Sequence, residues 1–274
     1  MKEEIINMPI YRREIINNRK SFSIWIVILV ALNAMIFSVY PSFASQQAGG
    51  LQELIKSYPE TFIKAFSLDV LDLTNILHYF GMEIYLFITL LGSIYAMILG
   101  SGIISKEEDE KTIEFLFAKP VSRTKIVTFK SLAVLSYILV FNIILFIANY
   151  TMMEIFKTSE YNLEIFILIS LGALLLHLTF AAIGLLVSIF IIKARTIMSV
   201  ALSIVIGTYF LGVASSVSDK LTSLKYISPF KYVDASYIIV NAKIDYKYLA
   251  IMILIISFSV ICTYISYCKK DIHN

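Results

Sequence analysis

The stretch "IFILISLGALLLHLTFAAIGLLVSIFII", residues 165–192, contains no Asp, Glu, Lys or Arg in 28 consecutive positions. A helix needs about 20 mostly apolar residues to cross a bilayer, and a helix satisfies its own backbone hydrogen bonds in lipid. We therefore predict a membrane-spanning helix here. At about 1.5 Å per residue it outruns a hydrocarbon core of about 30 Å, so we expect it to tilt or to protrude.

The rest of the chain repeats this property. Its 274 residues are 58% hydrophobic and 16% charged, with a mean hydropathy of +0.80, whereas soluble domains average about 45–50% apolar and about 25% charged. Five further stretches lack a charged residue: 21–40, 84–104, 131–149, 197–218 and 248–268. The sequence therefore predicts an all-α polytopic membrane protein with six transmembrane helices, built as a single transmembrane domain over residues 1–274.

The apolar stretch nearest the N-terminus, 21–40, follows a basic segment, as the core of a signal peptide does. Its apolar run, 22–40, is longer than the usual signal-peptide core of about 7–15 residues, so we predict an uncleaved first span. Six spans place both termini on one side of the membrane. That side carries 15 Lys and Arg and the other side carries 8, which predicts a multi-pass protein with both termini in the cytoplasm.

Three connecting segments are expected to have structure of their own. Residues 1–20 alternate apolar and basic side chains and predict an interfacial helix in the headgroup plane, with a plain basic tail as the alternative. Residues 41–78 contain apolar clusters and predict an amphipathic cap on the external face. Residues 219–247 are aromatic and basic around Pro229 and predict an external or re-entrant segment.

Small residues four apart predict close helix packing in lipid. The pairs are Ala96 with Gly100, Gly184 with Ser188, and Ser203 with Gly207. The link between the fourth and fifth spans is only residues 193–196, so these two helices are expected to be antiparallel neighbours.

No motif for catalysis, a cofactor or a metal is present. The chain has no P-loop, no GxSxG, no HExxH and no CxxC, and its three histidines are scattered. We therefore expect no enzyme activity, no cofactor and no metal site in this chain. A net charge of +3 gives no reason to expect nucleic-acid binding. Cys262 and Cys268 lie six apart on one predicted helix and are not expected to form a disulfide.

Polar residues within predicted spans are candidates for a functional role. Glu83 lies near the outer end of the second span, and His177 lies near the middle of the fourth. We consider both as cavity or gating residues, with an interhelical hydrogen bond as the alternative for His177. For Asn33 and Asn142 an interhelical hydrogen bond is the favoured interpretation.

A charged block interrupts the apolar sequence between the second and third spans. The block "KEEDEKTIEFLFAKPVSR", residues 106–123, has five acids and four bases in 18 positions. Ser105 and Glu108 have capping-box spacing, and the helix dipole favours acids in a first turn. The pattern predicts that a short helix begins here.

The block continues as an apolar stripe with a defined end. Pro120 ends the predicted helix, and Ser122 is placed to cap the next one. The residues of the stripe, spaced by three and four positions, are Ile113, Leu116 and Phe117. Residues 107–118 are therefore predicted to form an amphipathic cytoplasmic helix that fits a groove on a soluble partner.

The stretch "SKEEDEKTIEFLFAKPVSRTKIVTFK", residues 105–130, resembles the first cytoplasmic loop of permease subunits of type-2 ATP-binding-cassette (ABC) exporters. In that family the pattern is an acid pair, Gly-Thr, an apolar pair, Pro-Val-Ser-Arg and a Lys, and Lys111 here replaces the Gly. The segments "YRREIINNRKS" (11–21) and "YISPFKYVDAS" (226–236) are also similar to the family, so the resemblance covers essentially the whole chain.

The resemblance implies an architecture and a set of partners. Two permease chains pair as a homodimer or heterodimer in a bacterial plasma membrane, and two separate ATPase subunits dock below them. Residues 1–20 resemble the family's elbow helix, and 107–118 resemble its coupling helix, which ATP-driven closure of the ATPases pushes to open the permease outward. The implied ATPase-coupling residues are Glu107, Glu110, Thr112, Ile113, Leu116, Phe117, Pro120 and Arg123.

Two functional hypotheses follow. The first is the membrane permease of an ATP-driven exporter. Because the spans lack charge, its substrate is expected to be apolar or amphipathic, such as a peptide, an antibiotic or a lipid. The alternative is a non-transporting sensor or assembly module that recruits a soluble partner through 107–118.

Overall fold

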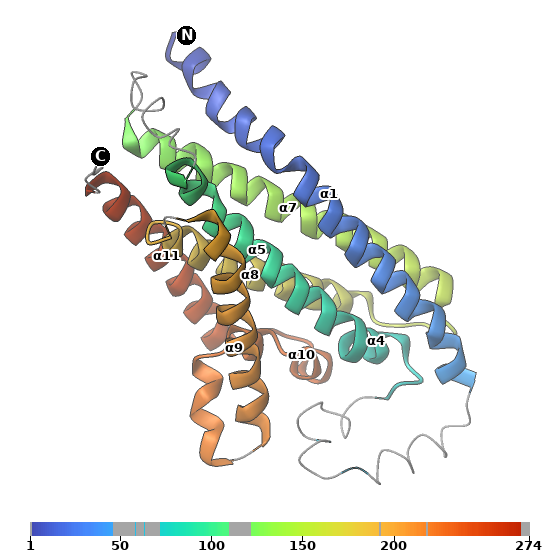
Figure 1. The fold of residues 1–274 in the computed structure, drawn as a ribbon. Coiled ribbons are helices and arrows are strands. Elements are labelled where there is room, and N and C mark those ends of the chain that lie inside the picture. The colour runs from blue at the N-terminus through green and yellow to red at the C-terminus, as the bar shows by residue number, and fades with distance from the viewer. Residues whose placement is uncertain are drawn as a thin grey trace.

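The computed structural model describes residues 2–45, 58, 63, 72–109, 122–191, 193–217 and 219–269. Within these residues all regular secondary structure is helical, and six helices are long and apolar enough to cross a membrane. The six are Ile10–Ser42, Ile76–Lys106, Arg123–Phe156, Leu163–Val187, Ile197–Val217 and Tyr246–Lys269. The prediction of an all-α polytopic membrane protein is confirmed, and Figure 1 shows the long helices assembled into one bundle.

The long helices are joined by shorter ones. The long helices are α1 (Lys2–Ser45), α5 (Tyr85–Asp109), α7 (Arg123–Phe156), α8 (Leu163–Val187), α9 (Ile197–Val217) and α11 (Tyr246–Lys269). The shorter ones are α4 (Ile76–Tyr79), the π-helical turn η1 (Phe80–Ile84), the 3₁₀ helices η2 (Ala194–Thr196), η3 (Asp219–Tyr226) and η4 (Pro229–Val233), and α10 (Ala235–Asn241). Because α4, η1 and α5 follow one another directly, they form the second span together.

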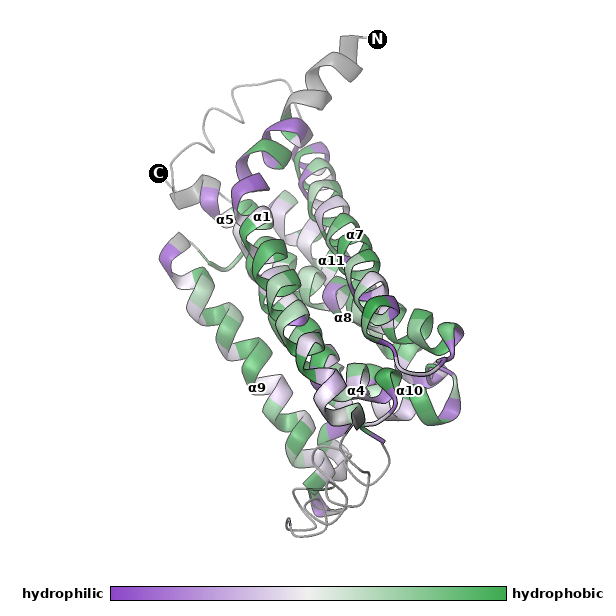
Figure 2. Cartoon of the chain, turned by 90° about the vertical axis from the view of Figure 1, so that its right-hand side faces the viewer, coloured by the Kyte–Doolittle hydropathy of each residue, from purple (hydrophilic) through white to green (hydrophobic). Residues whose placement is uncertain are grey.

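The second span lies at the centre of the bundle. Within its most apolar stretch 78% of the residues are buried, against 17% for the first and last spans. α5 packs mainly against α8, while α1 packs against α7, α11 against α8, and α9 against α5. The start of α1 and the end of α11 lie at the same end of the bundle (Figure 1), which we call the basal end; the opposite end is the distal end. Figure 2 also shows hydrophilic residues gathered towards these two ends.

α5 and α8 approach closely because glycines meet at their contact. A Cβ built on Gly100 would lie 2.4 Å from the carbonyl oxygen of Ala181, and one on Gly184 would lie 2.7 Å from the carbonyl oxygen of Met97. The predicted close packing is therefore confirmed at these two positions. It is not seen at Gly207 of α9, where an added Cβ meets no described atom within 4 Å.

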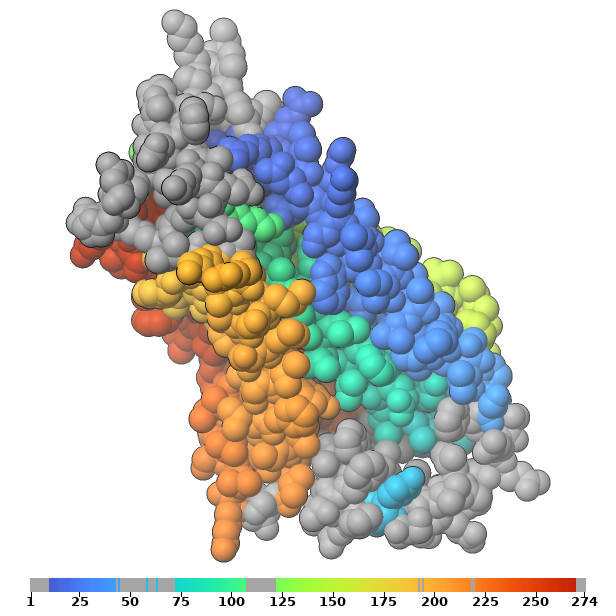
Figure 3. Space-filling model, viewed as in Figure 1, coloured from blue at the N-terminus to red at the C-terminus, as the bar shows by residue number. Residues whose placement is uncertain are grey.

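The first helix differs from the prediction. Residues 1–20 were expected to form a separate interfacial helix, but α1 runs without a break from Lys2 to Ser45. No glycine or proline lies between Ile10 and Tyr40 to interrupt it. At about 1.5 Å per residue, its 44 residues reach about 66 Å, which exceeds a bilayer of about 40–45 Å. Its first turns are thus a basal extension of the first span, and Figure 3 shows α1 as a long ridge on the surface.

The fourth span is shorter than predicted. α8 has 25 residues and ends at Val187, and residues 188–190 form a turn in which the Ser188 N–H donates to the carbonyl oxygen of Gly184. The chain therefore leaves the helix instead of extending it to residue 192. The expectation that the fourth and fifth spans are close neighbours is also wrong, because α9 packs along α5, η3 and η4.

Residues 219–247 form part of the bundle. η3 packs against α9, η4 packs against α8, α9 and α11, and α10 packs against α8 and η1. The side chains that anchor η4 and α10 are buried: Pro229, Tyr232, Val233, Ala235, Ile238 and Ile239. The segment predicted as external or re-entrant is therefore folded onto the distal part of the bundle.

Most of the predicted amphipathic cap, 41–78, lies outside the described residues. Its two ends are described. α1 continues to Ser45, and α4 begins at Ile76 with Asn75 as its N-cap, where Asn75 Oδ1 accepts a hydrogen bond of 2.9 Å from the Leu77 N–H.

Candidate functional site

The predicted ATPase-coupling residues lie mostly outside the described residues. Glu107 is in the last turn of α5, where only its backbone is described, and Arg123 is the first residue of α7. The others are Glu110, Thr112, Ile113, Leu116, Phe117 and Pro120, all outside the described residues. The coupling role of these residues stays a prediction, but the ends of the two helices that flank them are defined.

The predicted capping box at Ser105 is wrong. α5 continues through Ser105 as far as Asp109. Ser105 is buried, and its Oγ donates a hydrogen bond of 2.7 Å to the carbonyl oxygen of Ser101, one turn earlier. A capping serine needs an extended backbone, whereas this serine is held in a helix interior by the packing of Ile103 and Ile104 in the core. The first acids of the block, Glu107, Glu108 and Asp109, are therefore the last residues of a helix that continues from the second span.

The start of α7 agrees with the prediction. Ser122 is the N-cap, and its Oγ accepts a hydrogen bond of 3.4 Å from the Lys125 N–H. Arg123 Nη1 donates to the carbonyl oxygen of Cys268 at 3.2 Å. Because Cys268 is in the last turn of α11, where the helix dipole favours a cation, Arg123 ties the start of α7 to the end of α11.

A buried ion pair joins three helices at the basal end. Lys130 of α7 is completely buried, and its Nζ donates to Glu14 Oε1 of α1 at 2.7 Å and to the carbonyl oxygen of Ile103 in α5 at 2.6 Å. Glu14 is also buried. A buried charge without a partner is very unfavourable, so this pair fixes how α1, α5 and α7 meet.

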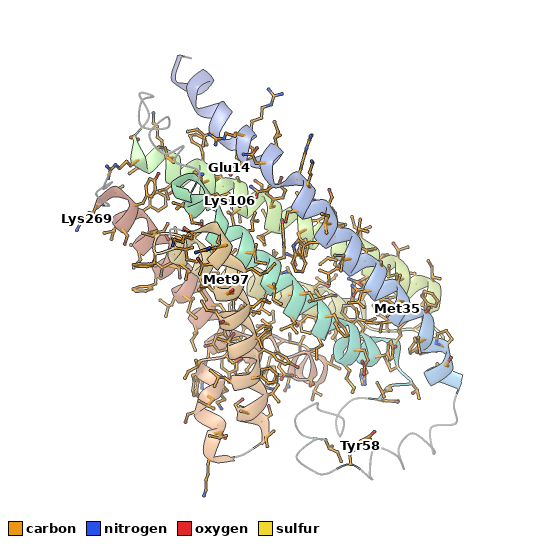
Figure 4. The ribbon with its side chains drawn as sticks, viewed as in Figure 1. Glu14, Met35, Tyr58, Met97, Lys106 and Lys269 are labelled. Carbon is orange, nitrogen blue, oxygen red and sulfur yellow. The ribbon has the colours of Figure 1, made fainter. Side chains whose placement is uncertain are left out.

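Polar neighbours extend this contact. Asn18 Nδ2 donates to the carbonyl oxygen of Glu14 at 3.0 Å and to Glu14 Oε2 at 3.5 Å, and Lys106 Nζ of α5 donates to Asn18 Oδ1 at 3.4 Å. Figure 4 shows Glu14 and Lys106 close together where α1 passes the end of α5. The Tyr137 hydroxyl of α7 donates to the carbonyl oxygen of Ile15. We call Glu14, Asn18, Ile103, Lys106 and Lys130 the basal joint.

Sequence reasoning missed the basal joint. The signal was present: Glu14 is the one acid between Arg12 and Lys20, and Asn18 lies one helical turn after it. Its partner Lys130 is the last residue of the stretch 105–130 that resembles the family, and the sequence there indicates no partner for it. Pairing the two across 116 positions required the packing of α1 on α7.

His177 lies in the core of the bundle. It is fully buried, with Nδ1 3.0 Å from Asn142 Oδ1 of α7 and Nε2 3.1 Å from the carbonyl oxygen of Ile88 in α5. Gly92 leaves room for the ring, because a Cβ there would lie 2.3 Å from His177 Nε2. The interhelical hydrogen bond predicted for Asn142 is confirmed. A gating role for His177 stays a prediction.

A second polar contact joins α1 to α7. Asn33 Nδ2 donates to Asn149 Oδ1 at 3.0 Å, and Asn149 Nδ2 donates to the carbonyl oxygen of Leu145 at 2.7 Å. The interhelical hydrogen bond predicted for Asn33 is therefore confirmed. A cavity of about 20 Å³, lined among others by Asn142, Asn149 and Ser170, lies beside these contacts and has room for one water molecule.

Glu83 lies in the π-helical turn η1 and is exposed. Turns of this kind are often found at functional sites. Its neighbours Gly81, Met82 and Tyr85 line a pocket of about 130 Å³ at the distal end, and Glu83 is not among the lining residues. Glu83 is therefore beside this distal pocket rather than in it, and its role stays a prediction.

The segment "YISPFKYVDAS" forms one wall of the distal pocket, with α5 and α9 opposite. Lys231 Nζ donates to Asp234 Oδ2 at 2.7 Å, and Asp234 Oδ1 caps α10 by accepting from the Ser236 N–H at 3.0 Å. The Tyr85 hydroxyl donates to the carbonyl oxygen of Val233 at 3.0 Å. Sequence reasoning recognised this segment, but not that it lines a pocket.

Aromatic residues hold this wall in place. Tyr232 stacks on Tyr248 of α11 with a centroid distance of 5.1 Å, and its hydroxyl donates to the carbonyl oxygen of Tyr226. Burial raises the pKa of the Tyr232 phenol above its ordinary value. Phe230 packs on Phe180 of α8 at 5.4 Å.

The described residues contain no cluster of three or more His, Cys, Asp or Glu that could hold a metal ion. Cys262 and Cys268 are both free thiols on α11.

The comparisons with known proteins agree with the architecture. The family model for the ABC-2 family transporter protein matches residues 8–272, which is nearly the whole chain. No curated protein matches the sequence. The family match spans all six membrane helices, the charged block and the basal joint together. The chain belongs to the ABC-2 transporter family and is a membrane permease of an ABC transporter.

Proposed function

We propose that this chain is the membrane subunit of an ATP-driven exporter whose ATP is hydrolysed by a separate ATPase subunit. Membership of the ABC-2 family supports this role. The observation that carries the proposal is the position of the charged block. The α5 end and the α7 start, which flank it, lie at the basal end with the start of α1 and the end of α11 (Figure 1). An ATPase bound there contacts the block through 107–118.

The charge distribution supports a cytoplasmic basal end. By the order of the six spans in the sequence, the segments on the side of the two termini carry 15 of the 23 Lys and Arg residues. Basic segments are retained in the cytoplasm during membrane insertion, which is also where ATP is available. The ATPase and the charged block are thus proposed to be on the same side of a bacterial plasma membrane.

The substrate is proposed to be apolar or amphipathic, such as a peptide, an antibiotic or a lipid. The spans present apolar surfaces, and their buried polar groups are neutral, apart from the basal joint. The distal pocket offers aromatic rings from Tyr209 and Phe230 beside the Lys231–Asp234 pair. Such a lining suits a molecule with apolar and polar parts.

A second permease chain is proposed to complete the transporter, as a homodimer or a heterodimer. Large apolar side chains remain exposed on α9, including Met198, Ile206 and Phe210. The alternative of a non-transporting sensor or assembly module is disfavoured by the family match.

The coupling role is tested by purifying the transporter from its own membrane through a tag on this chain. Phe117→Ala and Glu110→Gln are expected to reduce both the amount of co-purified ATPase and its activity. Phe258→Ala is the matched control, because it removes a ring of the same size that is exposed on α11 and belongs neither to the charged block nor to α9. If both coupling variants retain the wild-type ATPase content and activity, residues 107–118 do not form the ATPase contact.

A further inference from the structure

The basal joint brings together both flanks of the charged block. Ile103 precedes the end of α5 at Asp109 by six residues, and Lys130 follows the start of α7 at Arg123 by seven. Both distances are about two helical turns, or about 10 Å. The hydrogen bond from Lys130 Nζ to the Ile103 carbonyl therefore joins α5 to α7 about two turns from the charged block on each side.

The same ammonium group also holds α1. Lys130 donates to Glu14 Oε1, and Lys106 reaches Asn18 from α5. α1 is therefore attached to each flank through a separate charged side chain.

We infer that Glu14 and Lys130 are positioning residues for energy coupling. They tie the basal extension of α1 to both flanks of the charged block, so that a displacement of the block by the ATPase moves α1 together with α5 and α7. This inference rests on the proposed function, because it assumes that the ATPase acts on 107–118. The tie itself does not depend on that assumption.

Because the ion pair of the basal joint is buried, it is expected to transmit a movement from α5 and α7 to α1. A surface ion pair between long side chains can break and re-form, but Lys130 is completely buried and Glu14 nearly so. Separating them exposes one charge to an apolar interior, so the three helices are held as one unit. Asn18 accepts from Lys106 and donates to Glu14, which links the two charged contacts.

Hydrogen exchange of the intact permease–ATPase complex tests the tie first without nucleotide. The double variant Glu14→Gln/Lys130→Met removes both charges and keeps similar side-chain lengths, so it is expected to fold where a single variant fails. Faster exchange than in the wild type is expected in residues 10–20 and 101–107. Arg12→Met is the matched control, because it removes one exposed cation from the same helix. Unchanged exchange in the double variant, or an equal increase in the control, overturns the tie.

Trapping the ATPase with ATP and vanadate tests transmission. In the wild type, exchange is expected to change both in 110–121 and in 10–20. In the double variant, the change in 110–121 is expected to remain and the change in 10–20 to disappear. The stimulation of ATPase activity by the permease is expected to be about tenfold smaller in the double variant, a change within the roughly 5–150-fold range usual for coupled sites.

The failures are distinguishable. A wild-type response in 110–121 without one in 10–20, or a response in 10–20 that survives in the double variant, overturns transmission through the joint. A response in neither segment shows that the ATPase acts elsewhere. That result contradicts both the proposed function and the transmission of movement to α1. The comparison without nucleotide still tests whether Glu14 and Lys130 hold the three helices together.

Discussion

Gly100 of α5 and Gly184 of α8 face each other so closely that a Cβ on either one would lie 3.1 Å from the Cα of the other. The nearest atoms are backbone atoms: the Ala181 carbonyl oxygen at 2.4 Å from a Cβ on Gly100, and the Met97 carbonyl oxygen at 2.7 Å from a Cβ on Gly184. Backbone atoms within two packed helices cannot rotate away. The two central spans are therefore held at a separation that only glycine permits.

Gly184→Ala is expected to destabilise the protein by about 1–3 kcal/mol, because the added methyl group forces α5 and α8 apart. The measurement is thermal unfolding of the purified protein in detergent. Gly207→Ala is the control, since a Cβ there meets no described atom within 4 Å. Alanine is a better helix former than glycine by about 1 kcal/mol, so the control should be as stable as the wild type or more so. Equal losses in both variants would show that the contact is not responsible.

Lys130→Met is expected to destabilise the protein by about 3–5 kcal/mol, because Glu14 is left as a buried carboxylate without its cation. Glu14→Gln/Lys130→Met should be less destabilised than the single Lys130→Met variant. A double-mutant cycle with Glu14→Gln as the other single variant measures the interaction. Additive losses would contradict a direct interaction between the two side chains.

Gly92→Ala is expected to be damaging only while His177 is present. The new Cβ would lie 2.3 Å from His177 Nε2, and the ring nitrogens lie 3.0 Å from Asn142 Oδ1 and 3.1 Å from the Ile88 carbonyl oxygen. The variant should lose about 1–3 kcal/mol of stability through overpacking. In a His177→Ala background the same change should have little further effect. A full loss in that background would exclude the ring as the cause.

Asp234→Ala is expected to cost about 0.5–2 kcal/mol, because it removes the N-cap of α10 together with the partner of Lys231. Asp234→Asn should retain most of the stability, because an amide oxygen can still accept from the Ser236 N–H. Unfolding of both variants in detergent makes the comparison. If Asn is as damaging as Ala, the ion pair and not the cap stabilises the pocket wall.

Lys111→Cys is expected to be protected from a membrane-impermeant maleimide in intact cells and to react once the cells are opened. Lys243→Cys, between α10 and α11 and exposed at the distal end, is expected to react in both cases. Both are made with Cys262→Ser and Cys268→Ser so that only the new thiol reacts. Labelling of Lys111→Cys from outside intact cells would place the charged block on the wrong side for an ATPase.

The local predictions succeeded where the cause is local. Ser122 caps α7 because the chain enters from an extended backbone and a helix follows directly. The same logic failed at Ser105, since α5 already passes through that residue as a packed helix. A serine followed by an acid three positions later does not reveal whether the preceding residues are helical.

The prediction of a separate interfacial helix over residues 1–20 is wrong for a related reason. The basic residues of 11–20 indicated a polar surface, and they are exposed, but Glu14 and Asn18 on the other face are buried against α7 and α5. The long-range contacts stabilise a continuous α1. No local pattern distinguishes a helix that lies on a membrane from one that extends a span.

The sequence by itself determined the number of spans, their approximate limits and the side preferred by positive charge, because these depend on the length of apolar runs and on composition. Only the tertiary structure decided which small residues meet, where the charged groups of α1 and α7 pair, and how the distal segment folds back. Those outcomes depend on contacts between residues far apart in the sequence, such as Gly100 with Gly184 and Glu14 with Lys130, which arise only when the helices are packed together.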